Sequence, residues 1–194
     1  IPFGLHHVFY TPFWYSSFVE ADVIINGVHT VINGASPAYF QQLGSMSDLI
    51  GASQTTMDQV VSGTTRYMAG KFPFMIFGLP GAALAMYKCA KPSKKVLVGS
   101  LLFSAAGTAA ITGITEPIEF TFLFVAPWLF AIHAVLAGLS FMLMDLLNVF
   151  IGMTFSGGLI DFALFGLLPA GAGVATHWYY VLLVGVFYFG IYYF

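Results

Sequence analysis

The chain contains apolar stretches that are long enough to cross a lipid bilayer. The last of them, residues 162–194, holds no Asp, Glu, Lys or Arg and has His177 as its one imidazole. Over the whole chain, 6 Lys and Arg and 8 Asp and Glu make up 7% of the residues, whereas 59% are hydrophobic. A soluble domain needs more polar side chains than this to cover its surface. We therefore predict a protein whose solvent is a bilayer.

Four charge-free segments are candidate membrane spans, because a helix needs about 20 mostly apolar residues to cross the hydrocarbon core. They are residues 72–87, 96–115, 120–144 and 162–194. Between the first two lies a lysine loop, residues 88–95, which holds four of the six basic residues: Lys88, Lys91, Lys94 and Lys95. The positive-inside tendency places this loop in the cytoplasm, although a loop that is basic for solubility alone would read the same. The fold class we expect is an all-α polytopic membrane protein.

Residues 20–66 interrupt this pattern, because they hold most of the Asn, Gln, Asp and Ser of the chain taken together. Asn26-Gly27 and Asn33-Gly34 each follow β-branched residues, a pattern typical of hairpin turns. We predict a short polar β-hairpin outside the bilayer or at its edge. Further along, Thr55 and the Asp58 three residues later resemble a capping box that opens a helix toward Met68.

Two carboxylates, Glu116 and Glu119, interrupt the apolar region 96–144 within the sequence TGITEPIEF. Two spans joined by a tight turn would leave both carboxylates exposed to water at the membrane interface. The alternative is a re-entrant hairpin, because glycine and proline here free backbone groups that need partners in protein or in a water-lined cavity. A carboxylate at membrane depth is a candidate functional site, since it is costly elsewhere. An ionised carboxylate can accept two sugar hydroxyls or bind a cation.

A second group of polar side chains lies near the start of the chain, where His6 and His7 precede Tyr10 and Trp14. We do not predict a metal site, since consecutive side chains on a helix point about 100° apart and no His-x3-His pair or nearby cysteine completes one. Imidazoles beside aromatic faces suit a carbohydrate better. The same aromatic residues also fit an interfacial belt.

Several remaining residues limit which functions are possible. His133 and His177 stand alone in apolar stretches, and we interpret both as packing or interface residues. Asp145 and Asp161 bracket residues 146–160, so they end one span and begin another, and Asp161 lies deep enough to suggest a functional role. The single Cys89 excludes an internal disulfide framework and a cysteine zinc cluster.

The chain lacks the sequence motifs of nucleotide-driven and hydrolytic chemistry. No Walker loop, dinucleotide fingerprint, nucleophile elbow or HExxH motif occurs. The net charge of -2 and the absence of a basic stripe indicate no nucleic-acid partner. We expect no cofactor and no bound metal.

Four segments carry a resemblance to a known family: GLHH at 4–7, FGLPGAALAMYKCAKP at 77–92, TGITEPIEFTFLFVAP at 112–127 and SGGLIDFALFGLLP at 156–169. The chain resembles the membrane-embedded IIC domain of bacterial phosphotransferase-system sugar permeases of the glucose superfamily. The resemblance implies that residues 1–194 are a partial IIC domain, its C-terminal sugar-binding part with re-entrant hairpins, with the polar excursion at 20–66 and no IIA or IIB domain. It also implies a homodimer formed through an N-terminal part that is missing here. The absence of an initiator Met agrees with a piece of a longer polypeptide.

The resemblance implies a sugar site. The substrate-binding residues are then Glu116, Ile114, Thr115, Glu119, His6 and His7. Glu116 would bind sugar hydroxyls, and one of the two histidines would position the hydroxyl to be phosphorylated, with His7 favoured.

The resemblance further implies transport across the bacterial cytoplasmic membrane, coupled to phosphoryl transfer from a phosphocysteine IIB domain on the cytoplasmic side. Cys89 does not fit that phosphocysteine, so the chain is expected to be the membrane component of a phosphotransferase and to hold no catalytic residue itself. The stretches HHVFYTPFWYSSF and GKFPFMIFGLP resemble the maltose and α-glucoside branch of the family more than the glucose branch, which implies maltose as the substrate. Glucose in the same system is the alternative. An ion-coupled secondary sugar transporter or a non-transporting assembly subunit are further alternatives.

Overall fold

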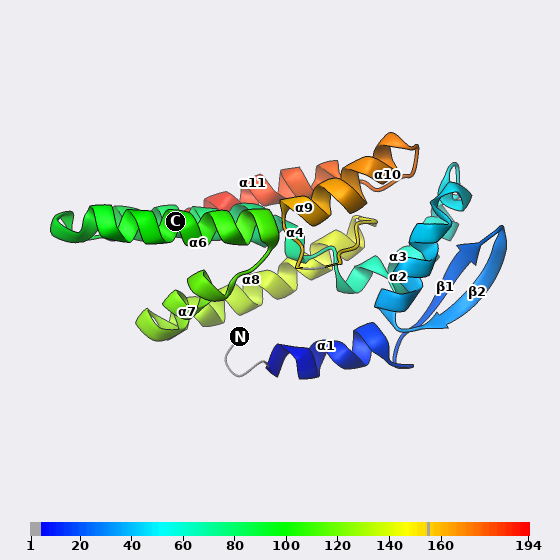
Figure 1. Cartoon of the computed structure of the whole chain (residues 1–194), viewed down its shortest axis with the longest axis horizontal. Coiled ribbons are helices and arrows are strands. Elements are labelled where there is room, and N and C mark those ends of the chain that lie inside the picture. The colour runs from blue at the N-terminus through cyan, green and yellow to red at the C-terminus, as the bar shows by residue number, and fades with distance from the viewer. Residues whose placement is uncertain (1–4, 155) are drawn as a thin grey trace.

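The computed structural model describes residues 5–154 and 156–194; for residues 5–7, 9, 122 and 125 it describes the backbone and not the side chain. The α-helices are α1 (Leu5–Tyr15), α2 (Ala35–Gly44), α3 (Gln54–Gly63), α4 (Lys71–Pro73), α5 (Leu79–Cys89), α6 (Lys95–Thr112), α7 (Glu116–Val125), α8 (Pro127–Leu146), α9 (Leu159–Phe162), α10 (Leu168–Gly171) and α11 (Tyr179–Tyr193). Shorter 3-10 segments are η2 (Met46–Leu49), η3 (Thr65–Tyr67) and η5 (Pro92–Lys94), and π-helical segments are η4 (Phe74–Gly78) and η6 (Ala163–Leu167). Two strands, β1 (Glu20–Ile25) and β2 (Val28–Asn33), complete the elements. The molecule is elongated, with the strands at one end and the lysine loop, between α5 and α6, at the other (Figure 1).

The predicted β-hairpin is present. β1 and β2 pair antiparallel, with Ile25 opposite Val28, so the turn is Asn26-Gly27. Both turn residues have positive φ, 52° and 75°, which the tight turn that matches strand twist requires. The second Asn-Gly pair forms no hairpin: Gly34 also has positive φ, but it leads directly into α2.

The predicted start and end of the helix after the hairpin were wrong by several residues. Ser53, and not Thr55, is the N-cap of α3, because its Oγ accepts the N–H of Thr56 at 3.2 Å. The helix also ends at Gly63 and does not reach Met68. Glycine is a poor residue for a helix interior, and the chain continues as the 3-10 segment η3.

Within residues 5–154 and 156–194, three helical stretches are long and apolar enough to cross a membrane: Thr65–Cys89, Pro92–Thr112 and Pro127–Leu146. They overlap the first three predicted segments. The apolar window of the first stretch is 78% buried inside the protein, against 17% for each of the other two. Thr65–Cys89 is therefore the interior helix, and the other two expose most of their surface to the surroundings.

The last two predicted segments are broken where the sequence analysis expected continuous spans. In 120–144, α7 ends at Val125 because Pro127 disfavours helical geometry at the preceding residue; Ala126 has φ -149° and ψ 80°. In 162–194 the structure has two shorter helical stretches, Leu159–Gly171 and Tyr179–Tyr193. The connection between them includes Gly173 and His177 with positive φ.

Two wide π turns each precede a proline within a helical stretch. Pro80 follows η4 and Pro169 follows η6. A proline ring clashes with the carbonyl four residues earlier in a regular helix, and in both stretches that carbonyl, of Ile76 or of Phe165, lies in the π turn. We interpret the wider turns as the means by which both stretches continue past proline.

Candidate functional site

Two loops from distant parts of the sequence are in contact: residues 113–115, between α6 and α7, and residues 156–158, before α9. Their main chains are in contact at glycines. A Cβ on Gly113 would lie 2.5 Å from the carbonyl oxygen of Ser156, and a Cβ on Gly158 would lie 2.5 Å from the nitrogen of Gly113. The Ser156 hydroxyl also donates to the Gly113 carbonyl at 2.8 Å. No side chain larger than hydrogen fits at either glycine.

Asp161 holds the second loop in shape. Its Oδ2 accepts the main-chain N–H groups of Ser156 and Gly157, both at 3.1 Å, and its Oδ1 accepts the Thr154 hydroxyl at 3.0 Å. The residue is only 3% exposed. A buried carboxylate with three donors is satisfied, so Asp161 acts on the site by fixing the loop.

A buried lysine faces this pair of loops. Lys71 begins α4 within the interior helix and is 9% exposed. Its Nζ lies 4.9 Å from the ring centroid of Tyr10 and 5.1 Å from that of Trp14. The two rings stack with centroids 4.8 Å apart. This arrangement stabilises the ammonium group by cation–π attraction, and Lys71 also lines two neighbouring cavities.

Two cavities share one wall. An inner cavity of 160 Å³ and an outer cavity of 660 Å³ are both lined by Tyr10, Lys71, Glu116 and Ser156. The outer cavity has the volume of a typical small-molecule site, and the inner one is smaller than that range. The larger cavity combines aromatic faces with hydroxyl, carboxylate and ammonium groups, which is the chemistry that a polyhydroxylated ligand requires.

Glu119 lies on the far side of the inner cavity. Its Oε1 is 3.4 Å from Nε2 of His133 on α8, and Nδ1 of the same imidazole is 2.7 Å from the hydroxyl of Tyr192 on α11. Glu119 and His133 are 7% and 6% exposed. These contacts link α7, α8 and α11, in agreement with the packing role expected for His133.

The structure brings the predicted residues of the TGITEP segment to the cavities. Ile114 and Glu116 line the outer cavity, and Thr115, Glu116 and Glu119 line the inner one. His6 and His7 lie in the first turns of α1, but their side chains are outside the described residues.

Sequence reasoning missed Lys71 and Ser156 as site residues. The sequence analysis began the apolar segment at residue 72 and gave Lys71 no role. The available signal was a single charge directly before a run of apolar residues, at the edge of a candidate span. Ser156 had no signal of its own, since its position depends on the contact between the two loops.

The candidate spans define a helical, multi-pass membrane protein, and the two cavities gather hydroxyl, carboxylate and ammonium groups in one place. The family model described as "Phosphotransferase system, EIIC" matches residues 1–138, and the chain belongs to this family. It is a multi-pass protein of the cytoplasmic membrane.

Two curated relatives match the whole chain. The chain is 47% identical over 194 residues to the PTS system glucose-specific EIICBA component of Staphylococcus saprophyticus, and 46% identical over 193 residues to that of Staphylococcus carnosus. Each match covers 100% of this chain and 26% of the relative. The chain thus spans about a quarter of the length of these relatives.

Proposed function

We propose that this chain is the sugar-binding part of a IIC domain that carries glucose across the cytoplasmic membrane. The observation that supports this most directly is the position of Glu116. It lies in the wall between the two cavities, beside Lys71 and Ser156, within a helical membrane protein of the EIIC family.

The groups around the outer cavity match the surface of a hexose. The Glu116 carboxylate accepts hydrogen bonds from hydroxyl groups, and the Lys71 ammonium donates to hydroxyl oxygens. Trp14 and Tyr10 offer aromatic faces to the apolar C–H surface of the ring. Ile114, Thr115 and Glu119 complete the set of residues we assign to the site and its support, and His6 or His7 on α1 remains our candidate for positioning the hydroxyl that is phosphorylated.

Glucose replaces maltose as the proposed substrate. The sequence analysis favoured maltose from two aromatic stretches, but both curated relatives described above are named glucose-specific. Two aromatic residues of the first stretch, Tyr10 and Trp14, stack on each other and contact Lys71, and this arrangement serves a monosaccharide as well as a disaccharide.

The proposal extends to domains and partners. Residues 1–194 are taken as part of a IIC domain, with 20–66 as its polar excursion and the loops at 113–115 and 156–158 as the tips of re-entrant hairpins. A phosphocysteine IIB domain on the cytoplasmic side is the expected phosphoryl donor, and the fused relatives, named EIICBA, support a IIB partner. A homodimer would form through a part of IIC outside this chain.

Equilibrium binding to the full-length parent protein tests the proposal. Glucose and maltose are each titrated and competed against the other, on the wild type, on Glu116→Gln and on Glu20→Gln as a matched control on the exposed hairpin. We expect tighter binding of glucose, and a loss of about tenfold or more in Glu116→Gln, because hydrogen bonds to a charged group contribute about 1.5–3 kcal/mol. Tighter maltose binding would overturn the substrate. Unchanged glucose affinity in Glu116→Gln would overturn the site.

The coupling is tested separately by uptake. Proteoliposomes that hold the full-length parent should accumulate sugar phosphate only when IIB is phosphorylated. Uptake that follows a proton or sodium gradient without phosphorylated IIB would indicate a secondary transporter instead.

A further inference from the structure

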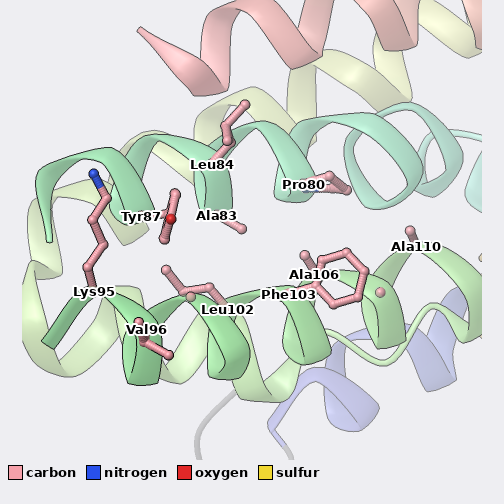
Figure 2. A pocket seen from close by; sticks show the side chains of 12 residues that line it. Pro80, Ala83, Leu84, Tyr87, Lys95, Val96, Leu102, Phe103, Ala106 and Ala110 are labelled. Carbon is pink, nitrogen blue, oxygen red and sulfur yellow. The ribbon is translucent and has the colours of Figure 1, made fainter.

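An apolar groove of 720 Å³ runs between α5 and α6, away from the sugar site (Figure 2). Its floor consists of small residues, among them Ala83, Ala106 and Gly107. Phe103 on its rim is 83% exposed. No atom of the described residues comes within 4 Å of a Cβ built on Gly107. The groove is therefore open, and it lies on a helix of which most of the apolar surface is not covered by the rest of this chain.

The groove is charged at one end only. Lys95 lines it beside Tyr87, with its Nζ 5.1 Å from the tyrosine ring centroid, and Figure 2 shows both at the same end. Lys91 and Lys94 are exposed in the adjoining loop. Among the described residues, no carboxylate forms an ion pair with these three lysines. Lys88 is engaged elsewhere, by the hydroxyl and ring of Tyr193.

We propose that this groove binds an anionic glycerophospholipid, with the phosphate held by Lys91, Lys94 and Lys95 and one acyl chain in the groove. The distance along α6 from Lys95 to Ala110 is about 22 Å at the rise of an α-helix. The groove is elongated and apolar, and its charged end lies at the end of a membrane helix. This shape and charge match an acyl chain joined to a phosphate. Basic sites between transmembrane helices bind anionic headgroups by the same attraction. A zwitterionic lipid would bind less well, because the cationic part of its headgroup would be repelled by the same lysines.

Native mass spectrometry of the full-length parent in detergent tests this, with dioleoylphosphatidylglycerol and dioleoylphosphatidylcholine as probes. We expect the anionic lipid to be retained at least fivefold more than the zwitterionic one. The triple variant Lys91→Gln, Lys94→Gln, Lys95→Gln should remove that preference. Equal retention of the two lipids by the wild type would overturn the proposal.

Two glycine variants separate the groove from the general surface. Gly107→Leu places a branched side chain in the groove, and Gly190→Leu places the same side chain on α11; at both positions a Cβ meets nothing within 4 Å outside the helix's own nearby backbone. We expect Gly107→Leu to lower retention of the anionic lipid several-fold and Gly190→Leu to leave it unchanged. Equal effects of the two variants would contradict the proposal.

Photo-cross-linking identifies the occupant directly. A benzophenone amino acid in place of Phe103, in membranes, should form adducts with phospholipid. Cross-links to another segment of the full-length chain, to a second copy or to a soluble domain would show that protein fills the groove and would overturn the proposal.

Discussion

The ammonium group of Lys71, on the interior helix, lies 4.9 Å from the centre of the Tyr10 ring on α1. An aromatic ring near the start of the chain therefore stabilises a charge on the interior helix. This contact joins α1 to the site. It also explains why a lysine that is 9% exposed can be kept within a candidate membrane span.

Lys71→Met is expected to weaken glucose binding by the full-length parent by about tenfold or more, because a charged donor to the sugar is lost. Methionine keeps most of the aliphatic stem, so thermal stability in detergent should stay the same or rise, since a buried charge has been removed. Lys71→Arg, which keeps the charge, should bind with intermediate affinity. Wild-type affinity in Lys71→Met would exclude the ammonium group from the sugar site.

Glu119→Gln is expected to lower stability more than affinity. Its carboxylate lies beside His133, and a neutral amide weakens that contact, which we estimate at about 1–3 kcal/mol of unfolding free energy. Glucose affinity should fall less than in Glu116→Gln. The double variant Glu119→Gln, His133→Gln should be less destabilised than the sum of the single variants, because they remove one shared contact. Additive destabilisation would show that the two side chains do not stabilise each other, and a binding loss equal to that of Glu116→Gln would place Glu119 in contact with the sugar.

Asp161→Asn tests the support of the second loop. The amide has only one acceptor oxygen for three donors, so we expect a loss of about 1–3 kcal/mol in stability together with weaker glucose binding. Asp58→Asn on α3 is the matched control, since its partner Gln54 is an exposed side chain. A surface substitution of that kind should change the free energy of unfolding by no more than about 0.5 kcal/mol. Equal melting temperatures for the two variants would contradict the loop-holding role.

The orientation of the lysine loop is checked with Ser93→Cys in a Cys89→Ser background, which removes the one thiol of residues 1–194, and the same background without Ser93→Cys gives the labelling of any other thiol. Ser93 is exposed in that loop. A membrane-impermeant maleimide should label inside-out vesicles and not intact cells, as the positive-inside tendency predicts. Labelling of intact cells alone would reverse the topology.

Elements with strong local signals could be predicted from the sequence. The charge-free segments indicated the membrane helices, and Asn26-Gly27 indicated the hairpin turn, because both depend on composition or on two adjacent residues. The breaks at Pro127 and in 172–178 were missed because the number of apolar residues in a segment does not show where a helix ends.

The candidate site was predicted only in part, because some of its residues have no local signal in the sequence. Glu116 stood out because a carboxylate at membrane depth is unusual. Lys71 and Ser156 reach the same cavities through contacts across about 40 residues or more of sequence, with Tyr10 and with Gly113. Hydrophobic periodicity does not determine which loops meet, so the sequence alone could not combine them.

The glycine contact between the two loops has a mechanical consequence. At Gly113 and Gly158 the polypeptide backbones touch with no flexible side chain between them, and the Ser156 hydroxyl ties them further. Neither loop can slide past the other without breaking that contact. If the chain acts as we propose, a transport cycle that keeps this contact carries both loops together as a single clamp.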